Sequence, residues 1–232
     1  MKFPISLALL AAAASASPIQ ERQIIDIIGS TANGLDGPCK DITFIFARGS
    51  TEIGNMGTIA GPPTANLVLR EFGADAVAVQ GVDYEARLDT NFLPNGADPK
   101  GIEDMKEKLA STVTRCPETI IIAGGYRQTP VYSQGAALTH QAVEESDPAV
   151  VARIAGIVTF GDTQNEQDGG RVPGYPPEKT KIICALGDLV CEGTLVIMPA
   201  HLTYTMDAPE ASEFFIQMIN NAKSAAPAAT PA

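Results

Sequence analysis

Five short apolar runs, rich in β-branched residues, alternate along the chain with stretches of helical pattern. The runs cover residues 41–50, 75–82, 118–125, 154–162 and 180–186. Runs that are apolar throughout are typical of strands buried on both faces of a parallel sheet. Parallel neighbours need crossover connections, which are right-handed and usually helical. The alternation therefore predicts an α/β fold with a central, mostly parallel five-stranded sheet flanked by helices.

Four stretches between or after these runs predict the helices. They cover residues 62–73, 101–116, 136–146 and 208–223. The first has Pro near its start and Gly at its end, as helices prefer. In open α/β sheets, ligands bind beyond the carboxyl ends of the strands. We therefore expect chemistry in the loops that follow Phe46, Gly125, Phe160 and Leu186.

The two ends of the chain differ from the part between them. Residues 1–16 hold one lysine, an apolar run and a small-residue "ASA", which is the layout of a secretory signal peptide. This predicts cleavage after Ala16 and a secreted, extracellular protein. Residues 17–38 form a candidate pro-segment or N-terminal extension, and the Ala/Pro-rich residues 224–232 are expected to be a disordered tail. Residues 39–223 are long enough for one domain with a sizeable core.

The charge balance limits the partners. The formal net charge is −11, and so acidic a surface argues against binding nucleic acid or anionic lipid. After the predicted signal peptide, no apolar run is long enough for a membrane span. We expect a monomer.

The four cysteines are Cys39, Cys116, Cys184 and Cys191. An even number in a secreted chain predicts two disulfides, with three pairings open. A local bridge between Cys184 and Cys191 is the simplest choice, and it leaves Cys39 for Cys116. Zinc is the rival reading, but neither a CxxC pair nor a histidine cluster accompanies these cysteines. We therefore expect no metal.

Ser133 is the candidate nucleophile. It lies in "VYSQG" (131–135), between a strand-like run and a helix of small residues. That context suits a nucleophile elbow, in which glycines two residues before and after the serine relieve crowding. Gly135 is present, but Val131 occupies the earlier position. The motif alone is a weak signal, because a serine at a helix start explains it as well.

Two histidines and one aspartate bear on this serine. His140 lies seven residues after Ser133, so we expect a surface or half-buried helical histidine that points away from the turn. His201 lies in a loop before the last helix, and Asp188 lies inside the proposed short disulfide loop. A disulfide that closes this loop would hold the Asp188 carboxylate in place, which would help it to orient the imidazole of a histidine. The order Ser133, Asp188, His201 is the order of α/β-hydrolase triads.

At the level of separate motifs, the chain resembles the fungal cutinases over nearly all of residues 39–223. The motifs that carry the resemblance are "FARGSTEIGNMG" (46–57), "IIAGGY" followed by "SQGAAL", "GRVPGYP" (170–176), "GDLVC" (187–191) and "PAHLTY" (199–204). The resemblance implies a single-domain α/β-hydrolase without a lid. It also implies the cysteine pairs given above, and it implies no metal or organic cofactor.

The resemblance assigns roles to individual residues. Ser133 would be the nucleophile, His201 the general base and Asp188 its orienting partner. The oxyanion hole would come from the backbone N–H of Gln134 and from Ser50, which follows the first core strand.

Three apolar residues resemble the family's flaps over the acyl site. They are Leu88, Leu195 and Ile197, and partly exposed packing residues are an equally good reading of all three. The family's substrate is cutin, the ester-linked hydroxy-fatty-acid polymer of plant surfaces, and small soluble esters are also cleaved.

The chain departs from the family pattern just before Ser133. Cutinases run from "AGGY" directly to "SQGAA", whereas this chain inserts "RQTPVY" at 127–132. If the strand slid forward, Pro130 would enter a central strand, where it cannot donate its ladder hydrogen bond. Six extended residues also span about 20 Å of slack. We therefore expect "TIIIAGG" (119–125) to remain the strand and Tyr126–Val131 to bulge at its carboxyl end, which is the active-site face.

A second explanation is that the six residues are absent from the natural protein. Tyr132-Ser133 can be encoded TAC-AGC, which contains CAG, a common end of an intron. An earlier acceptor would then add six codons in frame. A transcript that contains the extra bases would rule this explanation out.

The sequence thus predicts a secreted carboxylic ester hydrolase that cleaves cutin and small esters through an acyl-serine intermediate. One alternative is a catalytically impaired, cutinase-like binding protein, which the insertion favours. Another is an esterase on a different polymer, such as acetylated xylan.

Overall fold

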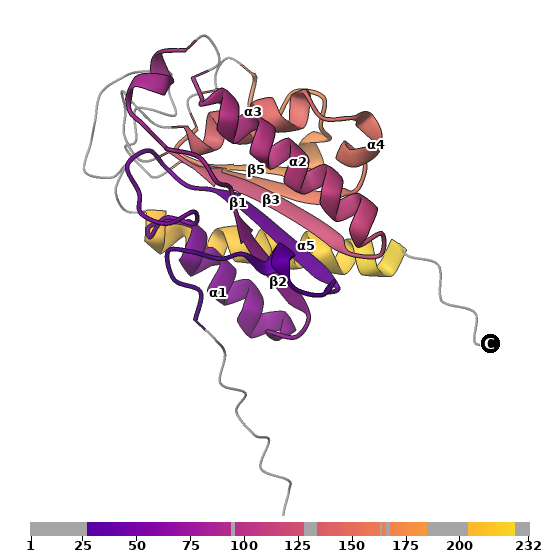
Figure 1. Ribbon diagram of the computed structural model, residues 1–232. Coiled ribbons are helices and arrows are strands. Elements are labelled where there is room, and N and C mark those ends of the chain that lie inside the picture. Colours follow the sequence, from indigo (N-terminus) through magenta and orange to yellow (C-terminus); the bar gives the residue numbers. More distant parts are fainter. Residues whose placement is uncertain are drawn as a thin grey trace, which may run out of the picture.

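A five-stranded, all-parallel sheet forms the centre of the molecule. The computed structural model describes residues 27–93, 96–127, 134–162, 164–165, 168–184 and 204–225. The strand order is β2-β1-β3-β4-β5 (Figure 1). The bounds are β1 Ile42–Ala47, β2 Val77–Gly81, β3 Ile120–Tyr126, β4 Ile154–Phe160 and β5 Thr180–Ile183. Each strand falls on one of the five predicted runs, with β3 extending one residue beyond its run, so the predicted sheet is confirmed.

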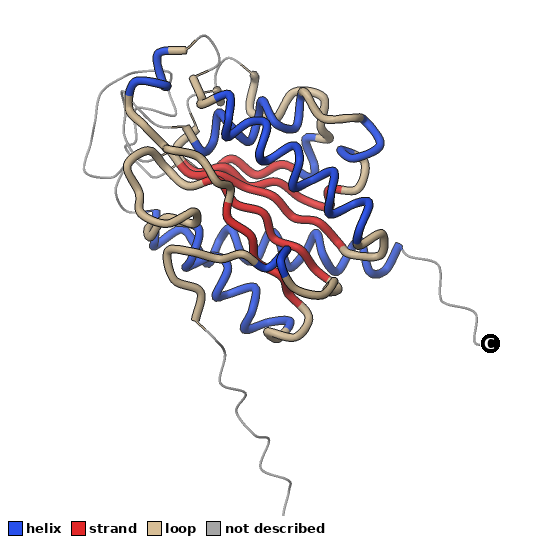
Figure 2. Tube along the Cα trace, viewed as in Figure 1, coloured by secondary structure: helices blue, strands red, loops and turns tan. Residues whose placement is uncertain are grey.

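Helices cover both faces of the sheet (Figure 2). Helices α1 and α5 pack together on one face, and α2, α3 and α4 lie on the other (Figure 1). Their bounds are α1 Gly61–Phe72, α2 Pro99–Arg115, α3 Gly135–Glu144, α4 Pro148–Val151 and α5 Ala208–Ala225. The four long helices match the predicted ones, whereas the single turn α4 and four short 3₁₀ turns were not predicted. Those turns are η1 Gly34–Asp36, η2 Asp89–Phe92, η3 Pro177–Lys179 and η6 Tyr204–Asp207.

The apolar character of the strands follows from this sandwich. Alternate residues of β1 enter different cores: Phe44 and Phe46 face α1 and α5, whereas Ile45 faces α2 and α3. On the first side, the Phe44 ring lies 5.2 Å from that of Phe215 of α5. Neither face of the central strands is exposed to solvent, which explains why apolar and polar residues do not alternate along them in the sequence.

The disulfide Cys39–Cys116 closes a loop of sequence separation 77, with a Cα–Cα distance of 5.5 Å. This pairing confirms the predicted one, and it ties the segment before β1 to the end of α2. Cys184 is also disulfide-bonded, and its predicted partner Cys191 lies outside the described residues. In the part of the chain that the structure describes, no helix is long and apolar enough to cross a membrane.

The stretch before Cys39 is bound to the sheet and to α1. The backbone N–H and C=O of Ile28 bond the side-chain amide of Asn66, and Asn33 forms an antiparallel bridge with Gln80 of β2. Ala32 is part of the core on the α1 side. Residues 28–33 thus pack on the domain as an N-terminal strap.

Strand β3 ends at Tyr126, before the inserted residues. Its register against β1 and β4 runs to Gly125 and Tyr126, respectively. The backbone N–H of Arg127 still donates to Phe160 at the end of β4, at 3.0 Å. The strand has therefore not slid forward, as predicted, but Tyr126, which was expected to bulge, is the last residue of the strand, because it pairs with Phe160 of β4. The rest of the inserted segment, 128–132, lies outside the described residues.

Candidate active site

The predicted site residues fall into two groups. Ser133, Asp188, His201, Leu195 and Ile197 lie outside the described residues, so their roles remain predictions. Ser50, Gln134 and Leu88 are described, and they come from three different segments. These segments all follow the carboxyl ends of strands.

Two glycines bring the end of β3 and the start of α3 into backbone contact. A Cβ atom added at Gly125 would lie 2.0 Å from the carbonyl oxygen of Gly135. A Cβ at Gly135 would lie 2.3 Å from the carbonyl oxygen of Ala47 and 2.5 Å from those of Arg48 and Tyr126. Distances this short leave no room for a side chain, so glycine is required at both positions. The start of α3 is thus enclosed by the ends of β1 and β3.

This crossing also brings together in space the two segments that carry the predicted oxyanion-hole residues. Gln134 directly precedes Gly135, and Ser50 follows Arg48 by two residues. Both Ser50 and Gln134 are fully buried. The two segments therefore meet where the carboxyl ends of β1 and β3 lie side by side, which is where the sequence predicted the chemistry.

The loop after β1 is organised by a buried arginine. Arg48 donates from Nε to the Glu52 carbonyl, at 2.9 Å, and from a terminal nitrogen to the Tyr84 carbonyl, at 2.6 Å. Its guanidinium lies 4.7 Å from the centre of the Tyr84 ring, and the Tyr84 hydroxyl donates to the Arg48 carbonyl. Burial raises the pKa of Tyr84, partly offset by Arg48, so the hydroxyl stays a donor at neutral pH.

A buried carboxylate fixes the same loop from inside. Glu52 accepts backbone hydrogen bonds from Gly49 at 2.8 Å, Thr58 at 2.8 Å and Ile59 at 3.0 Å. Burial raises the pKa of Glu52, and these bonds and the Arg48 charge oppose that rise. The carboxylate closes the loop around Ser50 and takes up N–H groups that would otherwise be unpaired.

Two left-handed residues join this loop to the next one. Thr51 and Ala86 are the non-glycine residues with positive φ in the described ranges, at 66° and 52°. The Thr51 N–H donates to the Ala86 carbonyl, at 2.9 Å. A β-branched residue in this region is strained, and such strain tends to collect at functional sites. Here Thr51 directly follows Ser50, and Ala86 precedes Leu88 by two residues.

The Gln134 side chain ties the start of α3 to the segment that carries Leu88. Its Oε1 accepts from the Asp98 N–H, at 2.8 Å. Its Nε2 donates to the Arg87 carbonyl and to the Thr90 hydroxyl. Leu88 lies within this segment and is 43% exposed, as a residue at the rim of an apolar site would be.

The expectation for His140 was wrong. Its side chain is fully buried, with one nitrogen near Asp162 and the other near Asp168. The sequence does place Asp162 in "FGD" (160–162) at the end of β4, but nothing in the sequence shows that this aspartate would face α3. Within the described ranges, no three His, Cys, Asp or Glu side chains are grouped so that they could hold a metal ion.

Known proteins identify the family. The family model described as cutinase matches residues 38–219. The chain belongs to the cutinase family. Membership places it among the carboxylic ester hydrolases.

Curated cutinases match over nearly their whole length. A probable cutinase 3 of Neosartorya fischeri is 46% identical over 220 residues, covering 94% of this chain and 96% of that protein. Cutinase CUT2 of Pyricularia oryzae is 47% identical over 217 residues, covering 92% and 98%. These matches confirm the resemblance inferred from the motifs.

Solved structures agree with the fold. Trichoderma reesei cutinase in complex with a phosphonate inhibitor superposes with a TM-score of 0.71 at 32% identity, covering 83% of this chain and 81% of that one. An acetylxylan esterase has a TM-score of 0.55 at 17% identity, which shows a shared fold only. The cutinase fold is therefore confirmed for this chain.

Proposed function

We propose that this cutinase-family chain is a secreted serine esterase that hydrolyses cutin and small carboxylic esters. His201 takes the proton of Ser133, the resulting alkoxide attacks the ester carbonyl, and Asp188 orients the imidazole. Expulsion of the alcohol, protonated by His201, leaves an acyl-serine. Water, activated by His201, then attacks this ester and releases the fatty acid.

The crossing of Gly125 and Gly135 is the observation that carries this proposal. An elbow needs glycine on both sides of the nucleophile, and residue 131 is valine. Gly125 takes the place of the missing glycine, because it packs against Gly135 although nine residues separate the two. The close approach of Gly125 to Gly135 supports an elbow between β3 and α3.

The donor side of the site supports the same reaction. Ser50 and Gln134 belong to two segments held by dense networks of hydrogen bonds, around Arg48 and Glu52 on one side and Asp98 on the other. Fixed donors stabilise a developing oxyanion without reorganising, typically by about 3–4 kcal/mol for one donor. The hydrogen bonds that would hold the donors in place are formed in the absence of substrate.

The test is covalent labelling of the whole chain with a p-nitrophenyl alkylphosphonate. Attack by Ser133 forms a serine–phosphorus bond and releases nitrophenolate, which is counted by absorbance while peptide mass spectrometry locates the adduct. We expect one label per chain, at Ser133, and none in Ser133→Ala. Absence of label from the full chain, with labelling after deletion of 127–132, would overturn the proposal in favour of the impaired binding protein.

A chain-length series separates the two enzyme readings. We expect turnover of soluble butyrate and hexanoate esters, together with release of hydroxy fatty acids from cutin. Turnover of acetate esters alone, with acetate released from acetylated xylan, would instead assign the other polymer. Secretion is checked on the culture supernatant, where the N-terminus should fall at Ser17 or later.

A further inference from the structure

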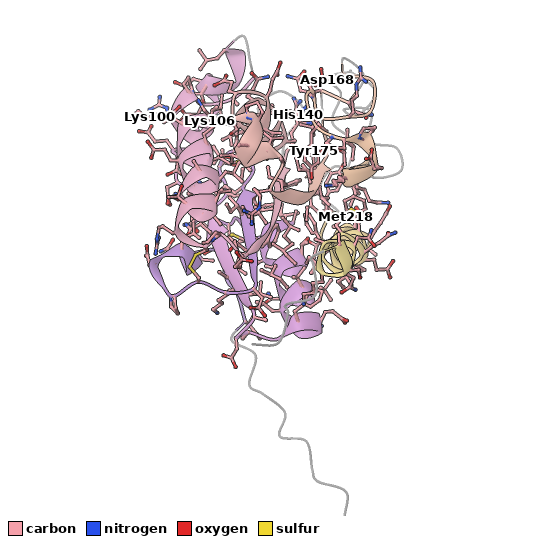
Figure 3. The ribbon with its side chains drawn as sticks, turned by 90° about the vertical axis from the view of Figure 1, so that its right-hand side faces the viewer. Lys100, Lys106, His140, Asp168, Tyr175 and Met218 are labelled. Atoms are coloured by element: carbon pink, nitrogen blue, oxygen red, sulfur yellow. A yellow bond between two sulfur atoms is a disulfide. The ribbon has the colours of Figure 1, made fainter. Side chains whose placement is uncertain are left out.

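His140 lies in a buried cluster of charge on α3. Its Nδ1 is 3.0 Å from Asp168 Oδ2, and its Nε2 is 2.7 Å from Asp162 Oδ2. Figure 3 shows His140 and Asp168 side by side. His140 and Asp162 have no exposed surface, and the Asp168 side chain is 23% exposed. His140 is the one titratable side chain that α3 buries.

The geometry requires a charged ring. A neutral imidazole carries a single N–H, so one nitrogen would turn its lone pair toward a carboxylate oxygen. Asp162 lies out of line with the N–H direction of Nε2, which has no aligned hydrogen-bond acceptor. The 2.7 Å contact is thus an ion pair rather than a directional hydrogen bond. Only the imidazolium interacts favourably with both aspartates.

The electrostatics of the pair agree with this charge state. Burial lowers the pKa of His140, but the two aspartates outweigh burial, so the pKa lies above its ordinary value. Burial raises the pKa of Asp162. The His140 charge, the Thr159 hydroxyl at 2.7 Å and the Gln164 N–H at 2.9 Å outweigh that effect, so the pKa lies below its ordinary value.

The cluster joins three segments at the carboxyl edge of the sheet. Asp162 follows β4 directly, and the N–H of the preceding Gly161 donates to Ile183 at the end of β5. Asp168 lies in a turn in which its own N–H donates to the Gln164 carbonyl, at 2.8 Å. His140 thus connects α3 both to the meeting point of β4 and β5 and to the turn beyond it.

Helix α3 is also held at its start, by the Gln134 side chain and by the close approach of Gly135 to the ends of β1 and β3. Beyond its start, four of its buried residues are small and interlock little with their neighbours, and Leu138, Thr139 and Val143 are buried beside them. Upstream, seven residues separate Tyr126 from Gln134, whereas a chain without 127–132 would have one. In general, a longer connection constrains the two elements that it joins less than a shorter one does. A buried ion pair, by contrast, is satisfied in one register only.

We infer that His140 is a positioning residue: its imidazolium, held between Asp162 and Asp168, fixes α3 and thereby the Gln134 backbone N–H at the helix start. The role deepens the proposed function and rests on it, because Gln134 is the predicted oxyanion donor next to the nucleophile. It compensates for the longer connection between β3 and α3.

The first measurement determines the protonation state of the His140 ring. In ¹⁵N-histidine-labelled protein, His201→Asn identifies the His140 signals. We expect both ring nitrogens of His140 to carry protons at pH 7.5, and one of these protons to be lost in Asp168→Asn. A neutral ring in the unmodified chain at this pH would overturn the inference. Asp168 is partly exposed, so Asp168→Asn keeps the packing of His140 against Asp162 and should fold.

The second measurement compares amide hydrogen exchange at residues 134–138 in the full chain and in the chain without 127–132. Coupling between neighbouring sites predicts that Asp168→Asn speeds exchange about tenfold in the full chain and about twofold or less in the shortened one. Glu144→Gln, at an exposed position of the same helix, is the matched control and should change neither. An equal change in both chains, or one spread equally to α5, would show a merely structural role and overturn the inference.

These readouts do not need a reactive Ser133. The phosphonate rate adds a third one: we expect Asp168→Asn to slow labelling about tenfold in the full chain, with the concentration for half-maximal rate unchanged. If the full chain takes no label, the proposed function fails. The positioning of α3 is then decided by the ring protons and by hydrogen exchange.

Discussion

The carbonyl oxygen of Gly135 packs against Gly125, although the two glycines are separated by nine residues of chain. A Cβ on Gly125 would lie 2.0 Å from that oxygen, 2.4 Å from the Gly135 carbonyl carbon and 2.5 Å from the Thr139 hydroxyl oxygen. The contact joins the last residues of β3 to the first turn of α3, from either side of the inserted segment. It makes Gly125 the residue on which the geometry of the turn depends.

Gly125→Ala should therefore damage both the fold and the site. Backbone atoms cannot move aside cheaply, so we expect the free energy of unfolding to fall by about 2–3 kcal/mol. We also expect the phosphonate labelling of Ser133 to be lost. Urea denaturation measures the first effect and peptide mass spectrometry the second. Gly29→Ala is the control, because nothing lies within 4 Å of a Cβ at that exposed position; equal behaviour of the two variants would contradict the prediction.

The fold could be predicted because β1 to β4 are buried on both faces and the four long helices carry their own signals. Asp98 caps α2 and Pro99 begins it, and both can be read from the chain. The Cys39–Cys116 bridge could be predicted because a local Cys184–Cys191 bridge is the simplest of three pairings and leaves this one.

The environment of His140 could not be predicted in the same way. Its partners lie 22 and 28 residues away in the chain, and only tertiary packing determines that β4 ends opposite this turn of α3. The same holds for Thr51 and Ala86, because their left-handed backbone is imposed by two loops that meet in space. Local sequence carries no signal for such pairings.

Glu52 should hold the Ser50 loop through its two carboxylate oxygens. In Glu52→Gln one oxygen becomes an NH₂ group, which cannot accept, so at least one of the three N–H groups at Gly49, Thr58 and Ile59 loses its partner. An unpaired buried donor costs about 1–3 kcal/mol, and we expect that loss of stability in urea. We expect kcat to fall more than KM rises, because the oxyanion wall is displaced.

The control for this loop is Glu71→Gln, a change at an exposed position of α1. It should alter neither stability nor turnover. If Glu52→Gln unfolds at the same urea concentration as the unmodified chain, the three hydrogen bonds are not what holds the loop.

Stability should depend on pH through His140. A group whose folded pKa exceeds its unfolded value stabilises the fold fully below the unfolded value of about 6.5 and loses that contribution as pH rises through the folded pKa. The pKa of His140 is raised by Asp162 and Asp168 against the effect of burial. We therefore expect the free energy of unfolding to decline as pH rises from about 6.5 toward 9.

The comparison that isolates this effect is Asp168→Asn, in which the decline should be shallower. Other charges lie near the helix: Lys106 of α2 pairs with Glu145 at 3.4 Å, and Arg127 is buried at the end of β3. The pKa of Lys106 is raised above its ordinary value by Glu103 and Glu145, so this lysine leaves the slope between pH 6.5 and 9 unchanged. A slope that is identical in the variant would show that His140 does not titrate in this range.

The Gln134 side chain should act on the site separately from its backbone N–H. Gln134→Ala keeps the predicted oxyanion donor but removes the bonds to Arg87, Thr90 and Asp98. Because displacement by about 1 Å can cost roughly 100-fold in rate, we expect kcat/KM on a soluble ester to fall between about 10- and 100-fold. Hydrogen exchange within residues 87–98 should become faster at the same time. Gln141→Ala, on the same helix, is the matched control; faster exchange with unchanged kcat/KM would mean that the side chain holds only the rim.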